Sequence, residues 1–406
     1  MLIHSHRPGQ FFHIVTLILL ATFTSCLKDE EAPPAYQPEF LIEAVHVLDL
    51  SREEVAEMLS QDGFYPPGTG VLIRYGVDAY RLTYNTVLWD GTEIEASGAL
   101  LIPKTTDKFP LLSFQPGTLG SPSEAPSLFQ SLYTDLASVF SSTGFIVALP
   151  DYPGYGVSAE IEHPYEHRQS LATATRDMIR AAREFFLVER REALSDQLFL
   201  SGYSAGGFAT LAALKLLQED HADEFRVTAA TAGGGAYNKT MMFRDIVGAD
   251  TARPHIGLYL WALDGYNKIY PELRRPYTAY FNEPWATQIA QDGVFSGVEN
   301  NPSLLLNPSF VEGILTGSDT EFLSVLADND VYDWRPEIPL KLYHGLIDEV
   351  VPFFNAQTAY DAMTARGAAD LELDRIGEGT HESSLINYMV GTFGYFFTVR
   401  DTGSGK

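Results

Sequence analysis

Short apolar runs recur along this chain, and longer stretches with helical spacing separate them. Runs that are apolar at successive positions are typical of strands buried on both faces. The stretches at 170–189 and 205–219 have helical periodicity. Strands that alternate with helices form parallel sheets with right-handed crossovers, so we expect an α/β fold with a mainly parallel central sheet flanked by helices. The runs are FPLLSF at 109–114, GFIVALP at 144–150, QLFLSGY at 197–203, VTAATAG at 227–233, PLKLYHG at 339–345 and LELDRIG at 371–377.

Two features interrupt this alternation. Asp90-Gly91 stands between two alternating runs, which predicts an antiparallel hairpin before the parallel strands. The interval between the fourth and fifth runs is far longer than one crossover helix needs, so we expect an inserted cap at about 236–335. The cap would interrupt a single α/β domain over 46–406. This domain would open with a helix from about residue 46, where Ser51 and Glu54 have capping-box spacing.

The predicted cap is rich in aromatic residues. We expect most of them to form the core of the cap, and the alternative is that they line an apolar binding pocket. They are Tyr259, Trp261, Tyr266, Tyr270, Tyr277, Tyr280, Phe281 and Trp285.

The first 25 residues predict a targeting segment. The apolar stretch at 14–20 follows Arg7 and is too short to span a bilayer, which is typical of a signal-peptide core. Cys26, the single cysteine of the chain, follows within LATFTSC, and this stretch resembles a bacterial lipoprotein signal. We therefore expect loss of residues 1–25, lipidation of Cys26 and a flexible, acidic, proline-rich tether over 26–45. The alternative is a soluble secreted protein.

The acidic composition restricts the partners of the chain. Asp and Glu number 53 against 27 Lys and Arg, which gives a formal net charge of −26. Nucleic acids need basic patches, so we expect no nucleic-acid partner. The same charge would keep the body of the protein away from anionic lipid, so we expect attachment to a bacterial membrane only through Cys26. This predicts an extracytoplasmic, lipid-anchored protein at the outer membrane or cell surface.

Ser204 lies where an apolar run ends and a helical stretch begins. Gly202-Tyr203-Ser204-Ala205-Gly206 fits the G-x-S-x-G nucleophile elbow, a strained turn whose glycines approach each other too closely for side chains. This setting predicts that Ser204 is a nucleophile. A serine hydroxyl reacts poorly until a base accepts its proton, so the chain must also supply a histidine and a group that orients it.

His381 is the best candidate for the base, because it lies in the glycine-rich loop IGEGTHESS just after the last strand. Asp348 follows the penultimate strand, where a carboxylate can reach the other ring nitrogen of the histidine. The order Ser204, Asp348, His381 is the one that α/β-hydrolases use. Asp333 is the alternative acid. The other histidines after Ser204 suit the role less well. His221 lies at a helix end, His255 in the predicted cap and His344 short of the loop tip.

Acyl transfer also needs N–H donors for an oxyanion. Ala205 offers one at a helix N-terminus. The second should come from the loop after FPLLSF, where Pro116 has no N–H. Gly117 and Thr118 are the candidates, and Thr118 is preferred.

With these residues the chain resembles the α/β-hydrolases and, more narrowly, the secretory lipase family and related bacterial esterases, over about 75–399. The resemblance rests on SFQPGTLGS, LPDYPGYGVS, HPYEH, SGYSAGG and HGLIDEVVP with the later histidine. It implies a serine hydrolase that cleaves small-molecule or lipid carboxylic esters in a capped apolar pocket through an acyl-enzyme, without a cofactor. Ser204 would be the nucleophile, Asp348 the orienting acid and His381 the base.

Three alternatives remain open: a cap-bearing serine peptidase, a carbohydrate esterase that removes acetyl or feruloyl groups, and a non-catalytic binding lipoprotein. His163 and His167 have a spacing found in metal ligands, but no HExxH pattern accompanies them. We interpret them as loop and helix-cap residues, and we expect no metal. The triple glycine at 233–235 is interpreted as a strand exit that lets the cap leave near the active site.

Overall fold

The computed structural model describes residues 36–61, 72–189 and 191–403. The predicted signal peptide and Cys26 lie outside the described residues, as does the predicted tether up to residue 35.

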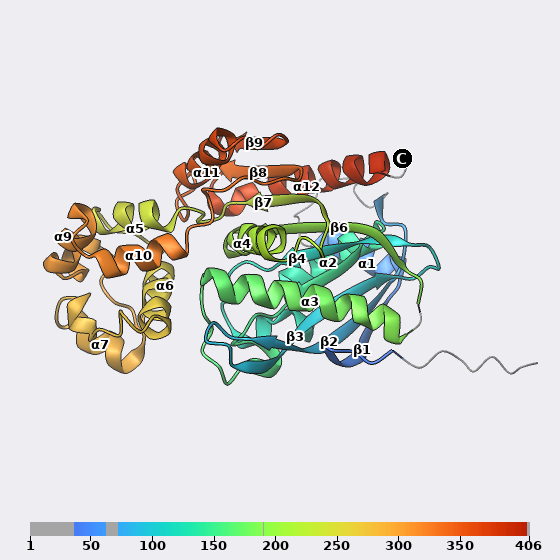
Figure 1. The fold of residues 1–406 in the computed structure, drawn as a ribbon, viewed down its shortest axis with the longest axis horizontal. Coiled ribbons are helices and arrows are strands. Elements are labelled where there is room, and N and C mark those ends of the chain that lie inside the picture. Colours follow the sequence, from blue (N-terminus) through green and yellow to red (C-terminus); the bar gives the residue numbers. More distant parts are fainter. Residues whose placement is uncertain (1–35, 62–71, 190, 404–406) are drawn as a thin grey trace, which may run out of the picture. The chain divides into compact units, whose positions relative to one another are not determined.

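A nine-stranded sheet runs through the described residues, with its strands in the order β1-β2-β3-β5-β4-β6-β7-β8-β9 (Figure 1). Neighbouring strands are antiparallel from β1 to β5, and every pair beyond β5 is parallel. The mainly parallel α/β sheet and the hairpin at Asp90-Gly91 are therefore confirmed. The strands are β1 (Leu41–Leu50), β2 (Val77–Val87), β3 (Glu93–Pro103), β4 (Phe109–Gln115), β5 (Ile146–Pro150), β6 (Leu194–Tyr203), β7 (Val227–Gly233), β8 (Leu340–Gly345) and β9 (Leu371–Ile376).

The start of the body differs from the prediction. Residues 41–50 form the edge strand β1 rather than the end of a tether and the start of a helix. The first helix begins only at Arg52, because Ser51 and Glu54 form the predicted capping box there. The Ser51 N–H donates to Glu54 Oε2 at 2.7 Å, and the Glu54 N–H donates to Ser51 Oγ at 3.2 Å. A cap residue stands outside its helix, so the preceding chain was free to pair with β2.

Two layers of helices cover the two faces of the sheet. One layer contains α3, α4 and α11, and the other contains α1, α2 and α12. The helices of the body are α1 (Arg52–Gln61), α2 (Leu132–Ser142), α3 (Arg168–Val188), α4 (Ala205–Asp220), α11 (Phe354–Ala365) and α12 (His381–Gly403), with short 3₁₀ turns at Pro122–Glu124, Pro126–Leu128 and Gly156–Ser158.

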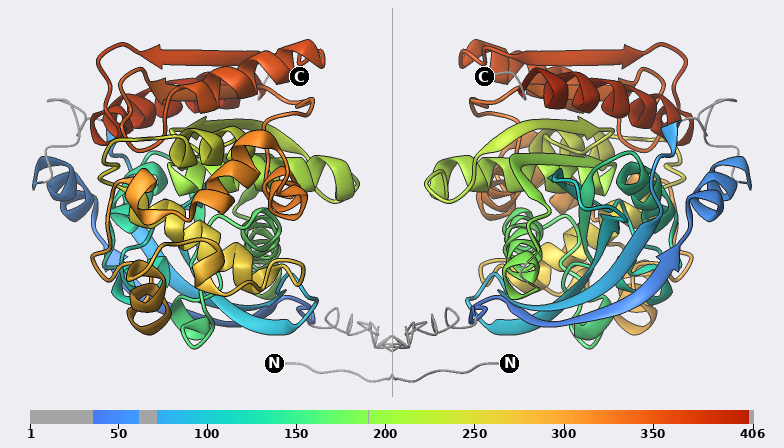
Figure 2. Two further views of the ribbon diagram at one scale, coloured as in Figure 1. Left: turned by 90° about the vertical axis from the view of Figure 1, so that its left-hand side faces the viewer. Right: turned by 90° about the vertical axis from the view of Figure 1, so that its right-hand side faces the viewer.

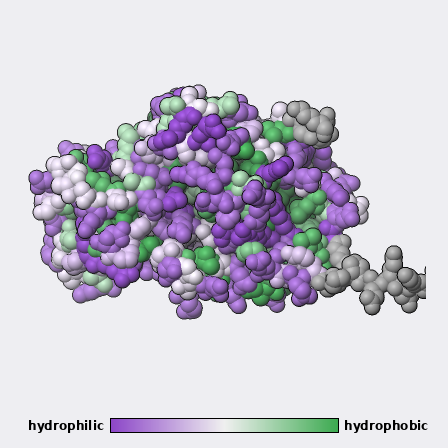
Figure 3. All heavy atoms as spheres, in the orientation of Figure 1, coloured by the Kyte–Doolittle hydropathy of each residue, from purple (hydrophilic) through white to green (hydrophobic). Residues whose placement is uncertain are grey.

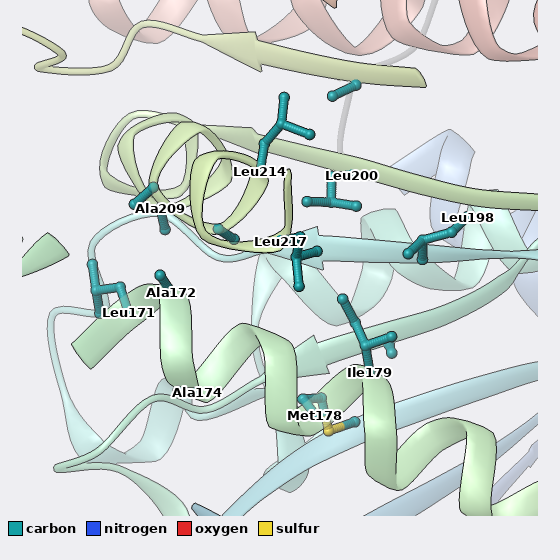
Figure 4. Packing of buried hydrophobic residues seen from close by; sticks show 14 of the residues in the cluster. Leu171, Ala172, Ala174, Met178, Ile179, Leu198, Leu200, Ala209, Leu214 and Leu217 are labelled. Atoms are coloured by element: carbon teal, nitrogen blue, oxygen red, sulfur yellow. The ribbon is translucent and has the colours of Figure 1, made fainter. Parts of the chain in front are cut away.

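The central strands are buried on both faces because their apolar side chains alternate between the two helical layers. In β6, Leu198 and Leu200 pack with α3 and α4, whereas Phe199 points into the opposite layer. Figure 4 shows Leu214 and Leu217 of α4 packed with β6 and α3. The prediction is wrong for β9, whose side chains are half-exposed because it forms the edge of the sheet.

The interval between β7 and β8 holds a group of helices, which Figure 2 (left) shows in yellow and orange in front of the sheet. Their apolar side chains form a cluster of their own, and Ala205 and Tyr165 of the body belong to the same cluster. Of the aromatic residues singled out in the sequence, Tyr266, Tyr280 and Phe281 are buried in it. The helices are α5 (Lys239–Val247), α6 (Ile256–Ile269), α7 (Trp285–Asp292), α8 (Pro302–Leu305), α9 (Pro308–Thr316) and α10 (Thr320–Asp328), with a 3₁₀ turn at Tyr277–Ala279.

On the face shown in Figure 3, hydrophobic residues lie in small groups between hydrophilic ones. Among the helices of the described residues, none combines the length and the apolar character needed to cross a bilayer.

Glu184 of α3 anchors the start of β1. Its carboxylate accepts hydrogen bonds from the backbone N–H groups of Glu39, Phe40 and Leu41 at 2.9, 2.8 and 2.7 Å, and the residue is only 6% exposed. We predict that Glu184→Ala lowers the free energy of unfolding by about 2–3 kcal/mol, because a charged acceptor of buried N–H groups is lost.

Urea denaturation measures this change, and Glu192→Ala is the matched control. The control substitution removes the same charge. The Glu192 side chain is 88% exposed, and among the ion pairs of the described residues it contacts only the exposed Lys108. We therefore expect the free energy of unfolding to change by less than about 0.5 kcal/mol. Equal effects of the two substitutions would contradict the anchoring role.

Candidate active site

The turn between β6 and α4 holds Ser204 in a strained conformation. Its φ is 60° and its ψ is −127°, a region that residues with a side chain rarely adopt. The Ser204 N–H donates to Gly233 O of β7 at 2.8 Å, which ties the turn to the sheet. A Cβ added to Gly202 would overlap Gly206 O, and one added to Gly206 would lie 2.8 Å from Pro116 O and still closer to Gln115 O. Only glycine lets these backbones approach so closely, as the elbow motif predicts.

The structure brings Ser204, His381 and Asp348 together in a chain of hydrogen bonds. His381 Nε2 lies 2.8 Å from Ser204 Oγ, and His381 Nδ1 lies 2.8 Å from Asp348 Oδ2. A carboxylate can only accept a hydrogen bond, so Nδ1 carries the proton and Nε2 is the acceptor for the serine hydroxyl. This arrangement can move the serine proton to the histidine and stabilise the imidazolium that forms.

Asp348 is held as an anion inside the protein. Its side chain is fully buried, and Oδ1 accepts hydrogen bonds from the N–H groups of Val350 at 3.0 Å and Val351 at 2.7 Å. Burial opposes ionisation, but hydrogen bonds from His344 and His381 outweigh it and lower the pKa of Asp348 to about 2. The carboxylate therefore stays charged at any pH at which His381 can act as a base.

The two residues that the sequence suggested as oxyanion donors have free backbone N–H groups in the described part of the chain. Among the described residues, the N–H groups of Ala205 and Thr118 have no hydrogen-bond partner. Ala205 is the first residue of α4, where the helix dipole adds to its attraction for an anion. The Gly117 backbone instead hydrogen-bonds the buried Tyr133 hydroxyl, whose pKa burial raises to about 12. This contact favours Thr118 over Gly117 as the second donor.

The segment DYPGY supports the loop that carries Thr118. Tyr152 donates to Pro116 O at 3.3 Å, and Tyr155 donates to Leu119 O at 2.8 Å. Two tyrosines thus fix the carbonyls on either side of the expected donor. In the sequence this segment stood out as one carrier of the family resemblance.

The cap contacts both the donor loop and the acid loop. Trp261 of α6 stacks on Tyr165 with ring centroids 4.2 Å apart, and the Tyr165 hydroxyl lies 2.8 Å from Thr118 Oγ1. On the other side, the hydroxyl of Tyr259 donates to Val350 O in the loop that holds Asp348. Residues of the predicted cap therefore contact the acid loop directly and the donor loop through Tyr165.

The other candidates from the sequence lie away from Ser204 or serve as local caps. Asp333 pairs with Arg366 at 2.5 Å, and His221 lies beside Arg176 at the end of α4. His255 caps α6 in the predicted cap region. His167 caps α3, as predicted, by accepting from the Ser170 N–H, and His163 Nδ1 bonds Pro153 O at 2.8 Å.

Sequence reasoning missed two residues that contact the site. Tyr203, the variable residue before Ser204 in the elbow motif, donates to His381 O at 2.7 Å. His344 was weighed only as a base, but it lies beside Asp348. The spacing of four residues between His344 and Asp348 was the available signal.

The comparisons with known proteins agree with this geometry. The family model described as secretory lipase matches residues 130–392, more than half of the chain. The chain belongs to the secretory lipase family. This confirms the family that the motifs indicated, and membership indicates an extracellular location.

Two lipases are similar to this chain. Lipase 10 of Candida albicans is 27% identical over 250 residues, 56% of this chain and 50% of that protein. Secreted triacylglycerol lipase LIP3 of Malassezia globosa is 25% identical over 314 residues, 71% of this chain and 64% of that protein. The chain thus spans about half to two thirds of the length of these curated relatives.

Solved structures confirm the α/β-hydrolase fold. A ligand-bound form of the rice cell wall degrading esterase LipA from Xanthomonas oryzae has a TM-score of 0.75 and 26% identity, covering 89% of this chain and 97% of that one. A Legionella pneumophila protein has a TM-score of 0.79 and 24% identity, covering 89% and 98%.

The elbow geometry predicts a strong effect of one methyl group. Gly206→Ala should lower the free energy of unfolding by about 2–3 kcal/mol, because the new Cβ meets the rigid carbonyls of Gln115 and Pro116. Urea denaturation gives the change. Gly394→Ala is the control, since nothing lies within 4 Å of a Cβ at that position in α12, and it should be neutral or stabilise by up to about 1 kcal/mol. A Gly206→Ala protein as stable as the control would contradict the close approach.

Proposed function

We propose that this protein hydrolyses carboxylic esters through an acyl-enzyme on Ser204. The observation that carries the proposal is the continuous chain of 2.8 Å contacts from Ser204 Oγ through the His381 ring to Asp348. The lipases and the esterase to which the chain is similar support an ester substrate. They give no support to the peptidase or the non-catalytic lipoprotein.

In the first half of the proposed reaction, Ser204 Oγ attacks the ester carbonyl carbon while His381 Nε2 takes the serine proton. The tetrahedral oxyanion binds the N–H groups of Ala205 and Thr118, which are placed before the reaction starts. The carbonyl then re-forms, and the alcohol leaves with the proton from His381. In the second half, His381 takes a proton from water while the water oxygen attacks the acyl carbonyl. The bond between the acyl group and Ser204 Oγ then breaks, His381 returns the proton to Oγ and the carboxylic acid leaves.

The aromatic side chains beside the donor loop favour an apolar group on the substrate. Trp261 stacks on the buried Tyr165 and meets the ring of Phe295 edge-on at 5.4 Å, and Phe295 is 60% exposed. These rings extend from the neighbourhood of Ser204 to the surface of the cap. A carbohydrate esterase is the second candidate function, because the likeness to the rice cell wall degrading esterase extends over 97% of that chain.

A series of nitrophenyl esters from acetate to palmitate tests the proposal. We expect the wild-type protein to hydrolyse them, and Ser204→Ala and His381→Ala to lose at least about a thousandfold in kcat/KM with the fold intact. A preference for long acyl chains supports a lipase, and a preference for acetate supports the carbohydrate esterase.

Circular dichroism and thermal unfolding control for the fold of each variant. A wild-type protein that turns over no ester in the series, or a Ser204→Ala variant as active as wild type, would overturn the proposal.

We further propose that the protein is anchored to a bacterial membrane by a lipid on Cys26. The support is the signal-like sequence before this cysteine. Expression of the full chain with a clickable palmitate analogue should label the wild-type protein and leave Cys26→Ser unlabelled. Cys26→Ser should also move from the membrane fraction to the soluble fraction. Equal labelling of the two proteins, or none of either, would contradict the anchor.

A further inference from the structure

We propose that His344 is a positioning residue for Asp348, because its Nε2–H donates to the carbonyl of Val351 and lies beside the Asp348 oxygen that His381 also uses. The inference deepens the proposed function and rests on it. His344 would hold the carboxylate in place and limit how strongly that carboxylate attracts the proton of His381.

The geometry places His344 directly behind the acid. His344 Nε2 lies 2.7 Å from Val351 O and 3.4 Å from Asp348 Oδ2. Both side chains are fully buried. Nε2–H therefore donates to the Val351 carbonyl, and the negative Asp348 carboxylate lies farther from the same nitrogen, where it is stabilised by the N–H dipole.

The same histidine supports Asp348 a second time through Val351. The Val351 carbonyl accepts from His344, while the Val351 N–H donates to Asp348 Oδ1 at 2.7 Å. His344, Val351 and Asp348 thus form a closed ring of contacts. Both carboxylate oxygens are fixed, and Oδ2 is shared between two histidines.

The protonation of His344 follows from its burial. Among the described residues, its Nδ1 has no hydrogen-bond partner. A buried ring nitrogen without a partner costs more free energy when it carries a proton than when it does not. Both neighbours of Nε2 are acceptors, so the proton has a partner there. These contacts favour the tautomer of His344 that carries its proton on Nε2.

This arrangement predicts a measurable effect on His381. Each donor to Asp348 spreads part of the carboxylate charge that stabilises the His381 imidazolium. Without the His344 donor the carboxylate attracts that proton more strongly. Activity needs neutral His381, so the acid limb of the pH profile would move to higher pH.

Few other groups near the pair change charge in this range. Burial raises the pKa of Tyr203 and of Tyr259 well above neutrality, so both stay uncharged. Burial likewise raises the pKa of Tyr388 to about 12. Glu349 Oε2 lies 3.2 Å from the His381 N–H, and it is unchanged in every variant below, so its contribution cancels.

His344→Gln and His344→Met test the proposal as a matched pair. The two side chains have similar length and shape, but only glutamine carries an N–H near the position of His344 Nε2. The pH dependence of kcat/KM for a nitrophenyl ester is measured, together with the rate at which a fluorophosphonate labels Ser204. Labelling reports the activation of Ser204 without any need for an ester substrate.

We expect the acid limb of His344→Met to lie about half a pH unit to one unit above that of wild type, and the limb of His344→Gln to coincide with wild type. A role in packing alone would lower the plateau or the melting temperature of both variants without moving the limb. Identical limbs in all three proteins, or equal shifts in the two variants, would overturn the proposal.

Nuclear magnetic resonance of the wild-type protein with ¹⁵N-labelled histidine keeps the proposal testable if the variants do not fold. We expect a neutral His344 with its proton on Nε2, and a proton on Nδ1 would overturn the inference. A wild-type protein that reacts with fluorophosphonate but hydrolyses no ester would refute the ester proposal alone, because labelling still tests His344. If fluorophosphonate does not label Ser204, the proposed function fails. The resonance measurement of which His344 nitrogen carries the proton then decides the role of His344.

Discussion

The close approach of Gly202 and Gly206 around Ser204 is the constraint on which the rest of the site depends. The first turn of α4 lies against the carbonyls of Gln115 and Pro116, with no room for a Cβ between them. This contact brings the N-terminus of α4 beside the loop that carries Thr118. A looser turn would move Ser204 away from that loop.

Parallel pairing on the other side of β6 delivers the acid and the base. β7 pairs with β8, and β8 pairs with β9, so the loops after β8 and β9 end at the same edge of the sheet as Ser204. These two loops also bind each other, since the Ile347 N–H donates to Gly379 O at 3.2 Å. Asp348 and His381 lie 33 residues apart in the sequence, and this backbone contact fixes their separation in space.

Local patterns were sufficient to predict the parallel part of the sheet, the elbow and the residues Ser204, His381 and Asp348, which the structure brings together. Each depends on a short segment whose neighbours in space follow from parallel topology. The start of the body was not predictable in this way. β1 is an edge strand with mostly exposed side chains, and the contact that holds its start joins Glu184 to residues more than 140 positions away. No local pattern reports such a contact, although the capping box at Ser51 already excluded a helix before that residue.

The structure also explains why the two histidines beside Asp348 cannot exchange roles. The His381 side chain is 16% exposed, and both of its ring nitrogens have partners, so it can accept a proton from Ser204 and keep it beside a carboxylate. His344 is fully buried, its Nε2 is directed at the Val351 carbonyl, and its Nδ1 faces no acceptor among the described residues. A proton on Nδ1 would therefore have no acceptor among these residues, which costs free energy. Burial and hydrogen bonding therefore suit His381 to the proposed role of base and His344 to that of a fixed donor, although both lie within reach of the same acid.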